Sequence, residues 1–79
     1  MSRLEEMGHR EELRTRRRII EAEITSHSDS IRAALPLAGN LEDIDGEYIM
    51  MLAIKLNERV QELRGVKRKI EVLERELGL

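Results

Sequence analysis

The feature that most constrains this chain is a heptad repeat of apolar residues between residues 49 and 77. One position of the repeat is apolar in every heptad, and a second, three residues further on, is apolar except at Arg59. Such a seam forms a single stripe only on an α-helix, and the stripe needs a partner helix to exclude water. The first position holds Ile49, Leu56, Leu63, Ile70 and Leu77, and the second holds Leu52, Val66 and Leu73.

A weaker seam with the same spacing of three and four residues runs through the preceding part of the chain. Arg17 and His27 occupy two of its positions, and its apolar members are Leu13, Ile20, Ile24 and Ile31. The seam ends near Pro36, which disfavours helical geometry at the residue before it. Gly39 and Asn40 follow, and both residue types suit turns. The second seam therefore supplies the partner helix that the first one needs.

These patterns predict an all-α fold, an antiparallel two-helix coiled-coil hairpin, as a single domain over residues 1–79. The expected helices cover about 2–35 and about 41–77, with a turn at about 36–40. Asn40 is a suitable cap for the second helix, and Asp45 followed by Gly46 offers an alternative start. A fold-back at this turn places Ile20 opposite Leu56 and Leu13 opposite Leu63. It also places Leu4 and Met7 level with Ile70 and Leu73, and puts Arg17 and Arg59 in one layer.

Several apolar side chains near the turn do not belong to the hairpin seam. A helix that is apolar on all sides is normally buried on all sides. A chain of this size also commonly needs oligomerisation to complete its core. We therefore expect a homo-oligomer, most simply two hairpins in a four-helix bundle. The residues expected at this interface are Ile19, Ile44, Met50, Met51 and Ile54.

Composition excludes several classes of protein. Fourteen basic and sixteen acidic residues leave a net charge of −2, so no overall field attracts nucleic acid or an anionic membrane. Tyr48 is the only aromatic residue, which argues against a base-stacking surface. The longest apolar run, residues 48–54, is much shorter than the roughly 20 residues that cross a bilayer. The amino terminus lacks an export signal and cysteine is absent, so we expect a soluble cytoplasmic protein.

The sequence carries no catalytic set or cofactor fingerprint, so we expect neither enzymatic activity nor a bound cofactor. The predicted function is protein–protein interaction, as a small oligomeric scaffold, adaptor or assembly factor. The alternative is a small nucleic-acid-associated protein that binds through a basic end. That basic end comprises Arg14, Arg16, Arg17 and Arg18 together with Lys67, Arg68 and Lys69.

Two short patterns resemble metal-binding sites, but helix capping and an ordinary structural histidine explain them better. Asp43, Asp45 and Gly46 fit the middle of a calcium loop, but Leu52 stands where that loop requires its bidentate glutamate. Glu23 and His27 are one helical turn apart, yet two ligands do not make a site. We therefore expect no metal, with the acidic residues near the turn acting as helix caps.

The segment from Ile44 to Arg59 resembles part of the long first helix of the all-helical chorismate mutases, including the Asn-Glu-Arg step at residues 57–59. Those enzymes carry a further arginine before this step and a lysine after it. In this chain the corresponding positions are Glu42 and Ile70, so the resemblance implies no catalytic residue.

Overall fold

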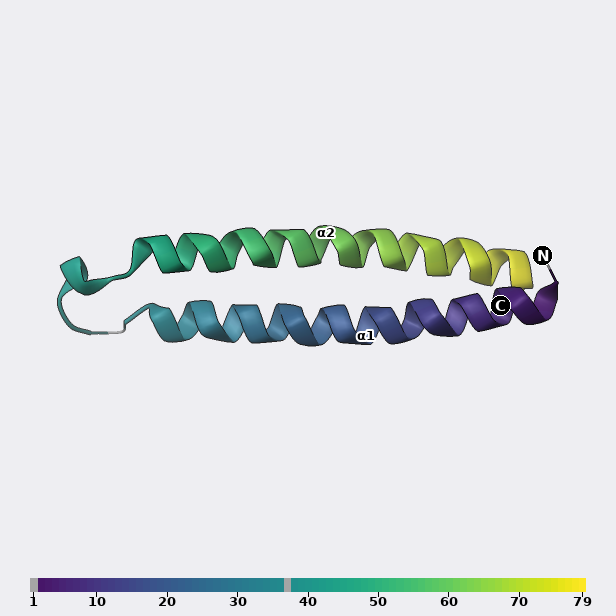
Figure 1. The fold of residues 1–79 in the computed structure, drawn as a ribbon, viewed down its shortest axis with the longest axis horizontal. Helices are drawn as coiled ribbons and strands as arrows, with labels where there is room; N and C mark the ends of the chain where they lie inside the picture. Colours follow the sequence, from purple (N-terminus) through teal and green to yellow (C-terminus); the bar gives the residue numbers. More distant parts are fainter. Residues whose placement is uncertain (1, 37) are drawn as a thin grey trace.

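The computed structural model describes residues 2–36 and 38–79 and folds them into a helical hairpin (Figure 1). Helix α1 runs from Arg3 to Ala34, a short 3-10 helix η1 from Leu41 to Asp43, and helix α2 from Gly46 to Leu77. The two long helices are antiparallel, and the chain termini lie together at the end opposite the turn. The predicted all-α hairpin is therefore confirmed. Leu37, inside the predicted turn, lies outside the described residues.

Both long helices begin and end with local capping interactions. The Ser2 hydroxyl accepts a hydrogen bond from the Glu5 amide at 3.2 Å, and the Asp45 carboxylate accepts one from the Tyr48 amide at 3.0 Å. These bonds satisfy amides that have no partner inside the helix. At the end of α2, Gly78 adopts the left-handed conformation with φ of 76°, which an L side chain rarely adopts.

The start of the second helix differs from the main prediction. Asn40 precedes only η1 and makes no side-chain capping bond, whereas Asp45 caps α2. The alternative start at Asp45 and Gly46 is therefore the one that the chain adopts. Extended backbone at Ile44 separates η1 from α2. The connection between the long helices consequently spans residues 35–45 rather than about 36–40.

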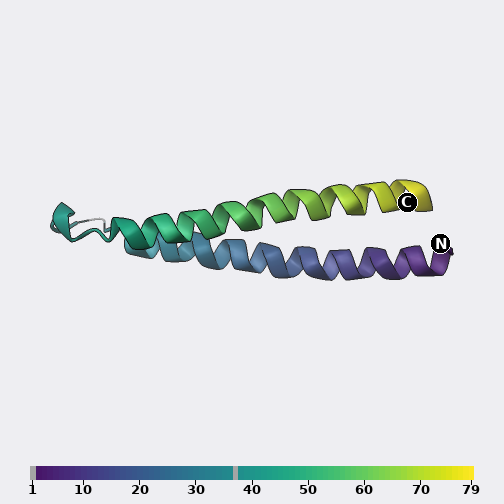
Figure 2. The same ribbon diagram turned by 45° about the horizontal axis from the view of Figure 1, so that its top comes forward.

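The hairpin is a rod rather than a globule, with dimensions of 60 × 15 × 14 Å. Its radius of gyration is 18.0 Å, against about 12 Å for a compact chain of this length. Figures 1 and 2 show that each long helix has only the other as a neighbour over its whole length. Neither helix, within the described residues, has the length and apolar character needed to cross a membrane.

A thin core runs between the helices. Ile20 is completely buried and forms a cluster with Val66 and Ile70, against which Leu13, Ile24 and Leu63 pack. All twelve apolar residues expected in the two seams are buried or half-buried. The buried ones are Ile20, Leu52, Val66, Ile70, Leu73 and Leu77, and the half-buried ones are Leu13, Ile24, Ile31, Ile49, Leu56 and Leu63.

The register between the helices is displaced by about one heptad from the expected one. Ion pairs join Arg16 to Glu62 and Glu23 to Arg59, so Ile20, between Arg16 and Glu23, lies level with residues near 60 rather than with Leu56. Accordingly, Ile20 and Leu13 both pack in the cluster formed with Val66 and Ile70.

The displacement also changes what faces the start of α1. The Arg3 guanidinium donates to the carbonyl oxygen of Leu77 at 3.0 Å, so Leu4 lies beyond Ile70 and Leu73. A shift of one heptad preserves the pairing of apolar with apolar residues, which is why the sequence pattern alone did not determine the register.

The buried position of Ile20 predicts a large loss of stability on truncation. Replacing Ile20 with Ala leaves a cavity in a core that has few other contacts, and should lower the free energy of unfolding by about 2 to 5 kcal/mol. Ile19, its neighbour, is 47% exposed, so the same truncation there should cost less than half as much. Urea unfolding of both variants, followed by circular dichroism, measures the difference. Equal losses would contradict the burial of Ile20.

Candidate interaction surfaces

A chain of ion pairs lies along one edge of the seam and links the two helices. The Arg16 guanidinium donates to the Glu62 carboxylate from Nε at 2.8 Å. Glu62 also pairs with Arg59 at 2.9 Å, and Arg59 in turn approaches Glu23 at 3.6 Å. The four side chains are 28–42% exposed, so their charges are only partly screened by water. Because oppositely charged groups alternate along the chain, this network favours the observed register.

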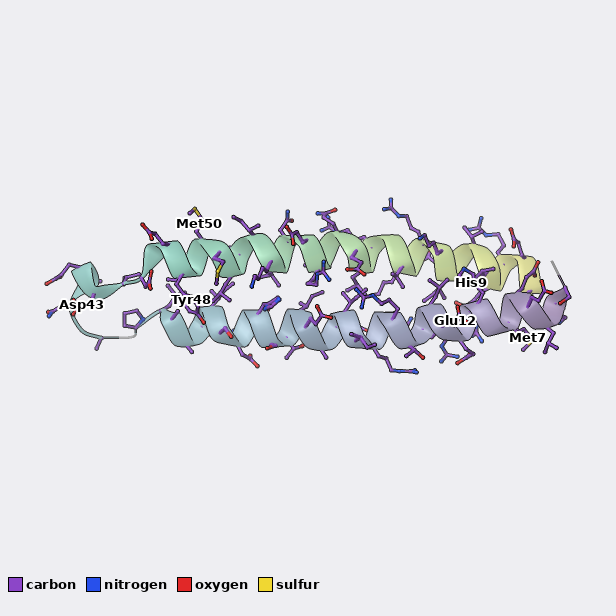
Figure 3. The ribbon with its side chains drawn as sticks, viewed as in Figure 1. Met7, His9, Glu12, Asp43, Tyr48 and Met50 are labelled. Atoms are coloured by element: carbon purple, nitrogen blue, oxygen red, sulfur yellow. The ribbon has the colours of Figure 1, made fainter. Side chains whose placement is uncertain are left out.

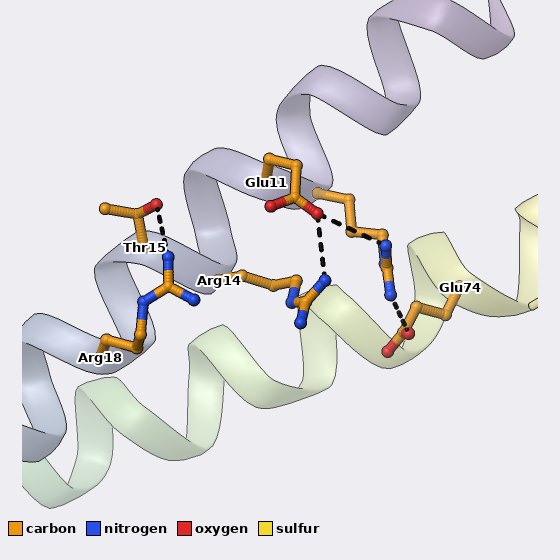
Figure 4. A network of polar contacts seen from close by, with 6 residues as sticks. Glu11, Arg14, Thr15, Arg18 and Glu74 are labelled. Carbon is orange, nitrogen blue, oxygen red and sulfur yellow. Dashed lines mark hydrogen bonds and ion pairs between the residues drawn. The ribbon is translucent and has the colours of Figure 1, made fainter.

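A second group of ion pairs holds the end of the hairpin where the termini meet (Figure 4). Arg10 pairs with Glu74 across the seam at 2.9 Å and with Glu11 at 3.5 Å. Glu11 also accepts a hydrogen bond from Arg14 at 3.1 Å. The Arg10 side chain is only 19% exposed, and these two carboxylates compensate its charge. Arg10 and Glu74 thus tie the two helices together near this end.

Arg17 and Arg59, which interrupt the two seams, do not share a layer as expected. Arg59 is level with Glu23, six residues beyond Arg17, which corresponds to roughly 9 Å along the helix axis. Each arginine has a carboxylate nearby, since Arg17 lies 3.6 Å from Glu21 and Arg59 pairs with Glu62 and Glu23. The separation removes the repulsion that a shared layer would have created.

The residues expected at an oligomer interface lie outside the hairpin core. Met50 is 60% exposed and Ile54 is 55% exposed, and Met51 and Ile19 are exposed to similar degrees. Ile44 is half-buried beside η1. In Figure 3 the Met50 side chain projects from the outer edge of α2, away from α1. We call Met50, Met51 and Ile54 the apolar surface of α2.

The heptad positions of Met50, Met51 and Ile54 explain why this surface is uncovered, because none of the three is at either position that faces α1. The stretch of α1 on the turn side of Glu23 contains Thr25, Ser26, His27, Ser28 and Ser30. Because Glu23 pairs with Arg59, this polar stretch lies alongside the part of α2 that carries the apolar surface. The half-buried apolar residues in this stretch of α1 are Ile24, Ile31 and Ala34. This part of α1 therefore covers the seam side of α2 and leaves the outward-facing apolar side chains in water.

The basic residues of the two helices come together, but three of them are neutralised. Residues 67–69 lie between Glu62 and Glu74 and are thus level with the stretch of α1 between Arg16 and Arg10. This is about one heptad from the expected position beside residues 7–9. Arg14, Arg16 and Arg17 pair with Glu11, Glu62 and Glu21, respectively. Within the described chain, Arg18, Lys67, Arg68 and Lys69 form no ion pair, and Arg18 donates only to Thr15 at 3.3 Å.

The residues that carry weak metal patterns have other surroundings. Asp45 caps α2, Asp43 belongs to η1, and His27 is half-buried in the seam. His9 lies 3.7 Å from Glu12 on the surface of α1. Among the described residues, no three side chains of His, Cys, Asp or Glu are grouped so that they could hold a metal ion.

A shallow apolar depression, which the sequence analysis missed, lies toward the free end of α2. It is lined by His9, Arg68, Lys69, Val72 and Leu73 and has a volume of about 390 Å³. Val72 is 47% exposed although it is surrounded by the best packed part of the seam. The sequence contained a signal, because Val72 is three heptads after Met51 and so lies on the same side of α2.

Fold and surface together define a two-helix hairpin with charged edges and an exposed apolar strip on α2. Comparison of the chain with protein families, with curated proteins and with solved structures finds no match in any of the three.

The position of Glu62 between two arginines predicts a specific electrostatic contribution. Replacing Glu62 with Gln removes the acceptor charge for both Arg16 and Arg59, and should lower the free energy of unfolding by about 1 kcal/mol. Glu71 is exposed on the same helix and has no ion pair among the described residues, so its replacement with Gln should have little effect. Thermal unfolding at low and high salt tests this. The cost at Glu62 should shrink at high salt, and an equal cost at both positions would contradict the network.

Proposed function

We propose that this protein is a non-enzymatic protein–protein interaction module whose hairpins self-associate into a small helical bundle, acting as a scaffold, adaptor or assembly factor. The observation that carries the proposal is the exposure of Met50, Met51 and Ile54 on one part of one helix. Scattered exposed apolar residues are normal, but a contiguous group marks an interaction site. The absence of cysteine suits a reducing compartment, and we place the protein in the cytoplasm.

The surface area of the hairpin supports self-association. Its accessible surface is 5943 Å², whereas a compact monomer of 9.2 kDa would expose about 4,900 Å². The excess of roughly 1,000 Å² is close to the approximately 800 Å² that each partner hides in a standard interface. Pairing two hairpins would therefore bring the exposed area per chain to that of an ordinary globular protein.

Self-association should depend on the apolar surface. Replacing Met51 and Ile54 together with Glu adds two charges where a partner would exclude water, and should weaken the oligomer roughly 100-fold or more. Asn57 is exposed on the same helix and already polar, so Asn57→Glu is the matched control and should leave the oligomer intact. Light scattering at micromolar concentration measures the mass. A monomeric mass for the unmodified protein would overturn the proposal.

A second candidate function is nucleic-acid binding through the basic end. It is favoured by Arg18, Lys67, Arg68 and Lys69, which have no ion-pair partner within the described chain and so have charges available for phosphates. Against it stand the net charge of −2 and the scarcity of aromatic residues. We therefore favour the proposal of a protein–protein interaction module over nucleic-acid binding.

The two candidates differ in their response to salt. Under the first proposal, neither single-stranded nor double-stranded nucleic acid should bind measurably at physiological ionic strength. Under the second, binding should fall steeply with salt as neutralised phosphates release counterions. The triple change of Arg18, Lys67 and Lys69 to Gln should then abolish it. A control with Lys55, Arg64 and Arg75 changed to Gln removes the same charge elsewhere. Fluorescence anisotropy distinguishes these outcomes.

A further inference from the structure

We propose that the second copy docks antiparallel, with α2 lying on the partner's α2 and the two turns at opposite ends. This inference rests on the proposed self-association and adds to it the identity of the docked surface. The docked surface is the side of α2 that carries Met51, which points neither toward α1 nor in the direction of Met50. The occupant is a second copy of this chain, for reasons of shape, charge and glycine placement.

Four residues spaced by sevens define this side of α2: Met51, Glu58, Gly65 and Val72. In an antiparallel pair centred between Gln61 and Glu62, Met51 comes level with the partner's Val72. Glu58 then comes level with the partner's Gly65. Each member of the stripe thus meets a different member, and no acidic residue of the stripe faces its own copy.

The depression around Val72 provides a place for the partner's apolar side chains. It is lined mainly by the apolar parts of His9, Val72 and Leu73 and by the stems of Arg68 and Lys69. In the antiparallel pair, the partner's Met51 and Ile54 lie over this depression. Methionine adapts its shape to irregular hollows, and both ends of the interface would receive the same contact by symmetry.

Charge along α2 favours the antiparallel direction over the parallel one. Glu47 and Glu58 lie in the half of the helix near the turn, whereas Arg68 and Arg75 lie in the half near its end. The four flank the stripe or belong to it. Antiparallel docking brings Glu58 close to the partner's Arg68 and Glu47 close to the partner's Arg75. Parallel docking would instead place each of these four charges opposite its own copy, which is unfavourable.

Gly65 gives an independent reason for close contact at the middle of the stripe. It lies in the interior of α2, where glycine costs about 1 kcal/mol relative to alanine. A Cβ atom added there would meet nothing within 4 Å inside the hairpin, so packing against α1 does not require glycine. The antiparallel pair places the side chain of the partner's Glu58 over this residue, and the missing Cβ leaves room for it.

Cysteine cross-linking tests the direction directly, since the chain has no cysteine of its own. Met51→Cys and Val72→Cys are made as separate variants, distinguished by mass, mixed, and treated with a short thiol cross-linker. Antiparallel docking should give mainly products that join residue 51 to residue 72. Ala22→Cys, on the exposed side of α1, is the control and should give few cross-links with any variant.

The outcomes separate the inference from the proposed function. A dimeric mass with mainly 51-to-51 and 72-to-72 products would overturn the antiparallel inference and leave self-association intact. A monomeric mass would overturn both. Gly65→Leu is a second measurement and should weaken the dimer at least tenfold while keeping helical content. Gly8→Leu, at the other helix-interior glycine with open space, should leave the dimer unchanged, and equal effects of the two changes would contradict close contact at Gly65.

One like-charge contact in the proposed pair allows a gain of affinity. Lys55 comes level with the partner's Arg68 and next to its Lys69 when the helices are antiparallel. Lys55→Glu should therefore tighten the dimer several-fold at low salt, an effect that fades at high salt. In a parallel pair, residue 55 faces its own copy, so the same change would replace one like-charge contact with another and give no gain. Unchanged or weaker association of this variant at low salt would overturn the inference.

Discussion

The whole hairpin depends on one apolar seam between two helices. Within the described residues no third element covers either helix, so each long helix excludes water on one side only. Among the described residues, Ile20 is the single side chain that is completely buried, and the cluster around it joins the centre of α1 to the later half of α2. A helix of this kind gains most of its stability from packing rather than from its own propensity. Every other feature of the molecule is arranged around this thin contact.

Charges along the seam perform a task that the apolar residues cannot. Leucine, isoleucine and valine fit almost equally well when one helix slides past the other by a heptad, because the repeat restores the same pattern. Pairs such as Arg10 with Glu74 and Arg16 with Glu62 exist in only one of these alignments. Individually such half-exposed pairs contribute little stability. Together they distinguish between alignments that hydrophobic packing leaves nearly equal.

The same seam explains why an apolar surface of α2 remains exposed. Near the turn, Met51 and Ile54 lie on α2 outside the two positions that face α1, so the hairpin leaves both side chains in water. At the other end of α2, Val72 is half exposed above a hollow. The exposed side chains of Met51 and Ile54 lie at one end of α2, and the depression beside Val72 lies at the other end on the same side. In the antiparallel pair that we propose, these two surfaces are complementary. This complementarity is the physical basis of the function that we propose.

The sequence by itself determined the two helices, their antiparallel hairpin and the residues of the seam. A seven-residue apolar repeat interrupted by Pro36 and Gly39 has few other ways to exclude water. The sequence did not determine which heptads face each other, because Leu56 and Leu63 are equivalent partners for the cluster around Ile20, and in the structure Leu63 packs there. It also left two starts for the second helix; in the structure Asn40 precedes only η1 and makes no capping bond, and Asp45 caps α2. Those choices, and the hollow beside Val72, follow from contacts between side chains far apart in the chain, which only the tertiary structure brings together.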